Sequence, residues 1–204
     1  MLDVLLVCGL LIGPSYLFLY ILGGALRPGY SQVSNSVSEL LSPGAPNKAL
    51  LGVIQGIYAL LHVAFGVGVL GVVRGSASGV LLLGAIGAGT IVAIGVATIG
   101  TAICPQDAEG TPATTAGRIH KTLVFGVLIP ASILSTLLLG LWATRAGVLR
   151  GFDLYSYVTV GAIVVMGGVG GAAVKTRYAG LSERVAALVT HQWLFVLGLR
   201  LLLR

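Results

Sequence analysis

Six long apolar stretches dominate this chain of 204 residues. Each is about as long as a helix that crosses the ~30 Å hydrocarbon core of a bilayer, which takes about 20 apolar residues. They cover residues 2–26, 49–73, 78–103, 122–144, 154–174 and 185–203. The mean hydropathy is +1.02, and charged residues make up only 9% of the chain, too few to cover a soluble domain. We therefore predict an integral membrane protein.

The spans are predicted to be helices, because a backbone in lipid must satisfy its own hydrogen bonds. The alternation expected of barrel strands is not visible. We expect an all-α fold, a single bundle of six transmembrane helices in one domain over residues 1–204, with kinks at Pro14 and Pro130. An even number of spans puts both termini on one side, here named the terminal face. The connections 27–48, 103–121 and 175–184 then share the other side, the loop face.

The expected location is the cell membrane, as a multi-pass protein. Asp3 stands where a cleavable signal peptide would carry basic residues, so the first span is expected to be retained. Lys and Arg divide almost evenly between the two faces, so the positive-inside rule does not decide the orientation. Longer polar connections are more often external, which favours cytoplasmic termini. Cys8 and Cys104 lie near opposite faces, too far apart for a disulfide within one subunit.

The net charge of +6 suits membrane lipids with anionic headgroups. Because the basic residues are scattered over both faces, no nucleic acid is expected as a partner. The 31 glycines fall mostly inside the spans. Small residues four apart let helices approach closely, either within one bundle or across a homodimer seam. Such pairs are Gly84/Ala88, Ala85/Gly89 and Gly167/Gly171.

The first loop-face connection is polar, rich in serine, and closed by proline and glycine turn signals. Ser36 and Glu39 have the spacing of a capping box, which predicts a short helix ended by Pro43. The alternative is functional. In that case Glu39, with Ser36 and Ser38, faces a polar pocket at the bilayer surface.

The second loop-face connection offers Thr114 or Thr115 as the N-cap of the fourth helix. Asp107 and His120 lie on the same face of the membrane as Glu39. A carboxylate and an imidazole that meet there could transfer protons or bind a metal. Alternatively, Asp107 forms an ion pair with Arg118 and only fixes the loop.

Two histidines lie inside the spans. His62 shares a helical face with Gln55 and Tyr58, and His191 lies seven residues after Arg184. Such a histidine is either functional or an interhelical hydrogen-bond partner. We considered a bis-histidine haem, and a zinc site built from His62, His120 and His191 with Asp107. Repeated or closely spaced histidine motifs are missing, so we expect no cofactor and no metal.

Several loop motifs resemble, in the same order along the chain, those of a prokaryotic membrane family known as domain of unknown function 998. They are Arg27-Pro-Gly-Tyr30, Val37-Ser38-Glu39-Leu40, Gly44-Ala-Pro46, Cys104-Pro-Gln-Asp107, Gly117-Arg-Ile-His120, Gly180-Leu-Ser-Glu-Arg184 and Trp193. A more distant likeness is to the damage-regulated autophagy modulator group. The resemblance implies a six-helix membrane protein without implying an activity, and it points to Glu39, Asp107, His120 and Arg184.

Together the motifs predict a polar cluster where the loop face meets the membrane. Glu39, Asp107 and His120 are its candidate catalytic residues, and the candidate ligand-binding residues are Arg27, Tyr30, Ser38, Arg118, Arg184 and Trp193. Basic and acidic groups beside an apolar bundle suit an anionic amphiphile, such as a phospholipid or a polyprenyl phosphate. Three alternatives stay open. The protein binds such a lipid or serves a structural role, it modifies the lipid by acid–base chemistry at His120, or it transports a small molecule.

Overall fold

The computed structural model covers residues 1–204 and describes all of them except Ala77, Glu109, Lys175 and the side chain of Ser78. Six helical elements are long and apolar enough to cross a membrane. They are α1 (Leu2–Ala25), α2 (Lys48–Arg74), α3 (Leu81–Ile103), the composite element Thr115–Arg145, α6 (Phe152–Ala173) and α7 (Ala179–Leu202). The prediction of an all-α protein with six membrane-spanning helices is confirmed.

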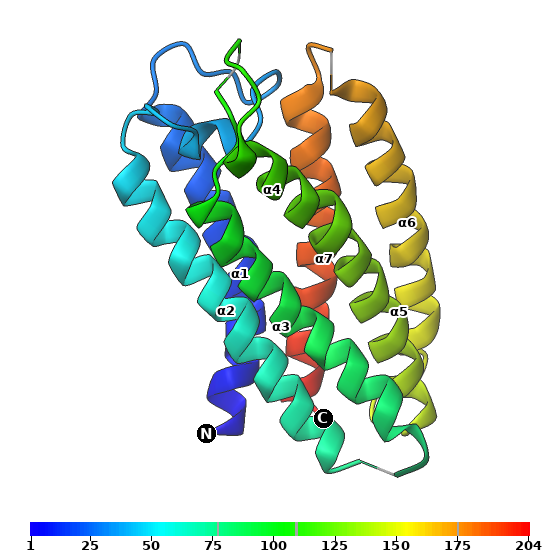
Figure 1. Ribbon diagram of the computed structural model, residues 1–204. Helices are drawn as coiled ribbons and strands as arrows, with labels where there is room; N and C mark the ends of the chain where they lie inside the picture. The colour runs from blue at the N-terminus through cyan, green and yellow to red at the C-terminus, as the bar shows by residue number, and fades with distance from the viewer. Residues whose placement is uncertain (77, 109, 175) are drawn as a thin grey trace.

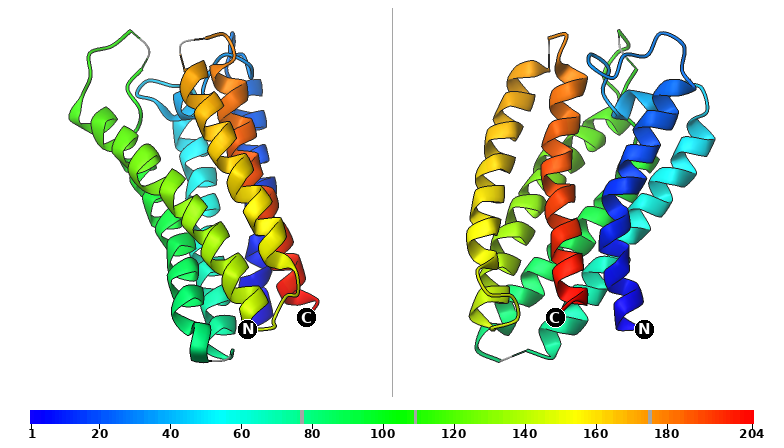
Figure 2. Two further views of the ribbon diagram at one scale, coloured as in Figure 1. Left: turned by 90° about the vertical axis from the view of Figure 1, so that its right-hand side faces the viewer. Right: turned by 180° about the vertical axis from the view of Figure 1, so that it is seen from behind.

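The helices form a ring in sequence order. Each packs against its neighbours along the chain, and α7 closes the ring against α1 (Figures 1 and 2). Both termini lie at one end of the bundle, and the connections that follow α1, α3 and α6 lie at the other (Figure 1). The predicted division into a terminal face and a loop face is therefore correct.

The composite fourth span has three parts, α4 (Thr115–Leu123), a π-helical turn η3 (Val124–Leu128) and α5 (Ile129–Arg145). Pro130 is the second residue after the π turn. Proline lacks an N–H group, and its ring clashes with the carbonyl four residues earlier. A wider turn before Pro130 relieves that clash, as π bulges inside helices do. By contrast, α1 is helical without interruption through Pro14.

Two predicted helix starts were too late. The fourth span begins at Thr115 rather than residue 122, and the sixth begins at Ala179 rather than residue 185. Hydropathy excluded these first turns because they carry charged and polar side chains. In the structure His120 and Arg184 are bound by the loops, as described below, whereas Arg118 and Lys121 are exposed. The third span begins with a 3-10 turn, η2 (Ser78–Val80), ahead of α3.

The apolar core has two parts. The larger part fills the terminal half of the bundle around Trp142, Trp193 and Phe65, and the smaller part lies under the first connection. Close packing at Gly84 is confirmed, since a Cβ there would overlap Trp142. At Gly167 and Gly171 a Cβ would meet no atom within 4 Å, so this pair does not pack within the chain. A homodimer seam at that pair stays a prediction.

Toward the loop face, α4 diverges from α6 and α7 (Figure 2, left). Side-chain burial in α6 and η3 decreases where the helices diverge. The fully buried residues of α6 end at Ile163, and the rest of the helix is exposed or only partly buried. None of the residues Val124–Leu128 is buried either. Apolar side chains such as Phe125 and Val165 are consequently exposed at membrane depth, between the terminal core and the loop face.

Candidate functional site on the loop face

The first connection folds back over the ends of α1, α2 and α7. Its 3-10 helix η1 (Ser38–Leu41) buries Leu40 and Leu41 against the upper part of the bundle. The predicted capping box is confirmed. The Glu39 amide donates to Ser36 Oγ at 3.2 Å, and the Ser36 amide donates to Glu39 Oε1 at 2.9 Å. The short helix ends before Pro43, as predicted.

Arg184 holds this connection to α7. Its side chain is only 4% exposed, and one guanidinium nitrogen donates to the carbonyls of Gln32 at 2.7 Å and Asn35 at 2.9 Å. The other terminal nitrogen donates to the hydroxyl of Tyr30. The guanidinium also lies over the Tyr20 ring, 5.1 Å from its centroid. Hydrogen bonds from a charged donor are worth about 1.5–3 kcal/mol each, so Arg184 is a latch between the loop and the bundle.

Neighbouring side chains add further hydrogen bonds that hold the first connection in place. Tyr30 donates to the Ser36 carbonyl at 2.8 Å, and burial raises its pKa to about 12, so the phenol stays protonated. Arg27 donates to the Glu39 carbonyl at 2.6 Å. The Glu39 carboxylate accepts from Asn35 Nδ2 at 2.8 Å as well as from the Ser36 amide. The predicted residues Arg27, Tyr30, Glu39 and Arg184 are therefore brought together, and they bind the loop itself.

Backbone contacts complete the seam between the first connection and α7. The Leu181 amide donates to the Val33 carbonyl at 2.9 Å, and the Val37 amide donates to Glu183 Oε2 at 3.2 Å. Gly180 is required for this approach, because a Cβ there would overlap the Asn35 carbonyl. Sequence reasoning missed the receiving carbonyls, since a main-chain acceptor leaves no side-chain signature.

The second connection is held by Asp107. Its carboxylate accepts from the Thr114 hydroxyl at 2.5 Å and from the Thr114 amide at 3.1 Å. The hydrogen bonds from Thr114 hold the pKa of Asp107 below its usual range. Thr114 in turn accepts from the Gly117 amide at 3.1 Å, which confirms it as the N-cap of α4. Asp107 thus fixes the loop through Thr114, whereas the expected partner Arg118 is exposed and donates to Thr115.

His120 joins the two connections. Its side chain is 6% exposed, with Nδ1 lying 3.1 Å from the Cys104 carbonyl and Nε2 lying 3.2 Å from Ser38 Oγ. Because both ring nitrogens have these partners, the imidazole does not pair directly with a carboxylate. The predicted acid–base set of His120 with Asp107 or Glu39 therefore has a serine where a carboxylate was expected.

The intramembrane histidines meet inside the ring. The hydroxyl of Tyr58 lies 2.7 Å from His191 Nε2, and His62 Nδ1 lies 3.0 Å from the Tyr58 carbonyl. The two imidazole rings are 6.2 Å apart between centroids. His120 is held separately at the loop face. Among the residues that the structure describes, no three His, Cys, Asp or Glu side chains gather in a way that would hold a metal ion.

Trp193 lies apart from the loop cluster. It is fully buried in the terminal half of the bundle, where its indole N–H donates to Ser156 Oγ of α6 at 3.0 Å. Its ring packs against Phe152. Its place in the structure is that of a core residue linking α6 to α7.

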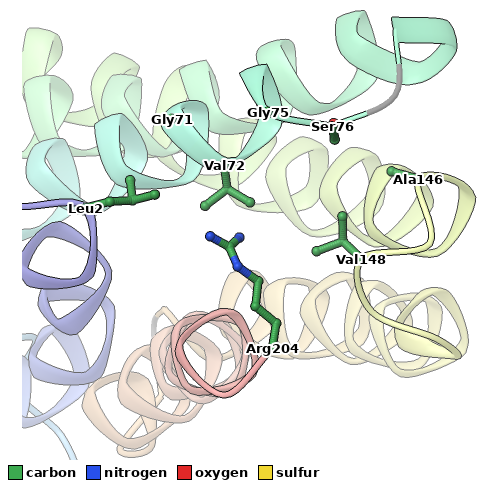
Figure 3. Close-up of a pocket in the computed structure, with 8 residues that line it drawn as sticks. All are labelled: Leu2, Gly71, Val72, Gly75, Ser76, Ala146, Val148 and Arg204. Carbon is green, nitrogen blue, oxygen red and sulfur yellow. The ribbon is translucent and has the colours of Figure 1, made fainter.

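The surface has hollows at both ends of the bundle. One, of about 410 Å³, lies on the loop face. It is lined by Pro43, Pro105, Asp107, Ala108, Thr111, Pro112, Thr114 and Ala116. The other, of about 570 Å³, lies on the terminal face, and Arg204 extends into it between α2 and the connection before α6 (Figure 3). There Ser76 donates to the Val73 carbonyl and accepts from the Trp142 indole.

Six helices ringed in sequence order, with loops latched over one end, define an integral membrane protein with an ordered loop face. The chain belongs to the family described as Protein of unknown function (DUF998), whose model matches residues 10–200. This match confirms the resemblance of the loop motifs. The comparison with curated proteins found no match. The comparison with solved structures found none either.

Proposed function

We propose that this protein binds an anionic amphiphile, a phospholipid or a polyprenyl phosphate, on its loop face. The observation that carries the proposal is the pairing of exposed cations with uncovered apolar helix faces. Arg118 and Lys121 lie exposed on the first turns of α4. The helix then continues into η3, which has no buried residue. A charged head at these cations would have its tails beside apolar side chains.

The hollow on the loop face supports the same reading. Its volume of about 410 Å³ falls within the range of small-molecule sites, about 300–1,000 Å³. Thr114 and Ala116 line it and begin the helix that carries both cations. The Asp107 carboxylate on its wall accepts hydrogen bonds from the Thr114 amide and hydroxyl, so part of its acceptor capacity is already used.

The contacts of the first connection limit which cations can bind the ligand. Arg27 and Arg184 were expected to hold a phosphate, but both donate to carbonyls of the first connection. In this proposal they keep the loop face folded, and Arg118 and Lys121 attract the ligand. We further propose that the protein lies in a prokaryotic cell membrane with its terminal face in the cytoplasm, which makes the binding face external.

Native mass spectrometry of gently solubilised protein tests the proposal. The double variant Arg118→Ala/Lys121→Ala should bind phosphatidylglycerol about 30-fold more weakly, since each cation near an anionic lipid contributes about 1 kcal/mol. The matched control removes two exposed cations from the terminal face, Arg74→Ala/Arg145→Ala. Equal losses in both double variants, or wild-type protein without bound lipid, would contradict the proposal.

A further inference from the structure

The pairing of Ser38 with His120 has the layout of a nucleophile and its general base. The two come from different connections, η1 and α4, and their side chains meet at 3.2 Å between Ser38 Oγ and His120 Nε2. Activated serines lie about 2.6–3.2 Å from the base that accepts their proton. Neither the cap of η1 nor that of α4 uses these two side chains, since Ser36 and Thr114 provide the caps.

The tautomer of His120 follows from its second partner. The Cys104 carbonyl can only accept a hydrogen bond, so the Nδ1 atom, 3.1 Å away, carries the proton. Nε2 then presents its lone pair to the Ser38 hydroxyl. In serine hydrolases a third group enforces this tautomer and orients the ring. Here a main-chain carbonyl, itself held at the end of α3, performs that task.

The two connections that meet at this pair both border the loop-face hollow. Ser38 is only half-buried. Pro105, directly after Cys104, and Pro43, on the same connection as Ser38, both line the loop-face hollow. An acyl chain could lie along the uncovered faces of η3 and α6 while its carboxyl end reaches the loop face.

We propose that Ser38 and His120 form a catalytic dyad that cleaves a carboxylic ester of a membrane amphiphile. Ser38 Oγ forms a bond to the ester carbonyl carbon as its proton passes to His120 Nε2. The carbon–oxygen bond to the alcohol then breaks, and the alcohol leaves with that proton. Water attacks the acyl-serine and gives a proton to Nε2, which returns it to Ser38 as the acid departs. Ester and water thus yield acid and alcohol. The choice of an amphiphilic ester rests on the proposed function, whereas the reactive pair stands on its own geometry.

A fluorophosphonate with a long alkyl chain tests the dyad, because it reacts with activated serines. Purified full-length protein in detergent is expected to be labelled at Ser38, as located by peptide mass spectrometry. Ser38→Ala should abolish this label. His120→Asn retains a donor for the Cys104 carbonyl but removes the base, and it should slow labelling at least about 100-fold. Ser34→Ala is the matched control, an exposed serine of the same connection, and should leave labelling unchanged.

Thermal unfolding in the same detergent shows which variants are folded. Label on Ser38 that is lost in folded His120→Asn supports the dyad, and so does hydrolysis of a fluorogenic acyl ester that follows the same pattern. Folded wild-type protein without label at Ser38 overturns it, and so does unchanged labelling in His120→Asn. Lipid binding by native mass spectrometry is a separate readout. Bound phosphatidylglycerol without label therefore overturns the dyad alone, and label without bound lipid overturns the binding proposal alone.

Discussion

At the scale of single residues, the loop face is organised by side chains that bind main-chain groups. Arg184 donates to two carbonyls, and Asp107 accepts from the Thr114 amide. Buried charges are costly unless they are paired or hydrogen-bonded, and here the loop backbone supplies the partners. A change that separates loop from helix should therefore be more damaging than the loss of an exposed charge.

Gly180 gives the most direct test of this seam. Gly180→Ala should lower the melting temperature in detergent by several degrees, because the new Cβ would overlap the Asn35 carbonyl and crowd the Arg184 guanidinium. Gly161→Ala is the control, since a Cβ there meets no atom within 4 Å. It should leave stability unchanged or slightly raised, as alanine is the better helix former. Equal melting temperatures for the two variants would show that the seam is not tight.

The capping of α4 should depend on pH. The pKa of Asp107 is lowered by Thr114 in the folded state, whereas an unfolded carboxyl titrates at about 3.9. Its stabilisation is thus present above about pH 4 and lost as the pH falls through the folded-state pKa. Amide hydrogen exchange over residues 107–117, corrected for intrinsic rates, should accelerate in acid. Asp107→Asn should remove this pH dependence, and an unchanged profile in that variant would contradict the assignment.

At the scale of helices, α6 packs most tightly in the part that lies near the terminal face. Its buried residues end at Ile163, and Ser156 accepts the indole N–H of Trp193 from α7. An unsatisfied buried donor costs about 1–3 kcal/mol. Tyr155 of α6 also donates to Gln192 Oε1 of α7, so the Ser156 hydroxyl supplies one part of the contact between the two helices.

Ser156→Ala should lower the free energy of unfolding by about 1–3 kcal/mol, measured by detergent-titrated unfolding. Thr159→Val is the matched control, because its hydroxyl donates only to the Tyr155 carbonyl of the same helix. It should cost clearly less. A larger loss of unfolding free energy in Thr159→Val than in Ser156→Ala would mean that the Trp193 indole finds another hydrogen-bond partner.

The helices and their caps were largely predictable from the sequence, because hydropathy and capping are local. The Ser36–Glu39 box was predicted, and the structure selects Thr114 from the two predicted caps, Thr114 and Thr115. The long-range partners were not predictable. Ser38 and His120 are far apart along the chain, and no local pattern pairs them. The carbonyls that receive Arg184 carry no signature at all, because every residue has one.

At the scale of the whole molecule, the two halves of the helix bundle differ in packing. The terminal half is tightly packed, and the half near the loop face is more loosely packed. Trp142 and Trp193 fill the terminal half. Toward the loop face α4 diverges from α6 (Figure 2), and the segment Val124–Leu128 has no buried residue. The exposed cations of α4 lie at the open end. This asymmetry predicts that both ligand binding and access are confined to one side of the membrane.

The orientation can be measured with single cysteines in a variant lacking Cys8 and Cys104. With the terminal face in the cytoplasm, Thr111→Cys on the loop face should react with a membrane-impermeant maleimide in intact cells. Gly147→Cys on the terminal face should react only after permeabilisation. The opposite pattern would reverse the orientation while leaving the site intact.

Photocrosslinking tests the central claim most directly. Protein in nanodiscs would be irradiated with phosphatidylglycerol carrying a diazirine in its tail, and the crosslinked peptides mapped by mass spectrometry. We expect crosslinks concentrated on residues 124–128 and 164–173, and a large reduction in Arg118→Ala/Lys121→Ala. Crosslinks spread evenly around the bundle, or equal labelling by the matched phosphatidylcholine probe, would contradict a specific site for an anionic amphiphile.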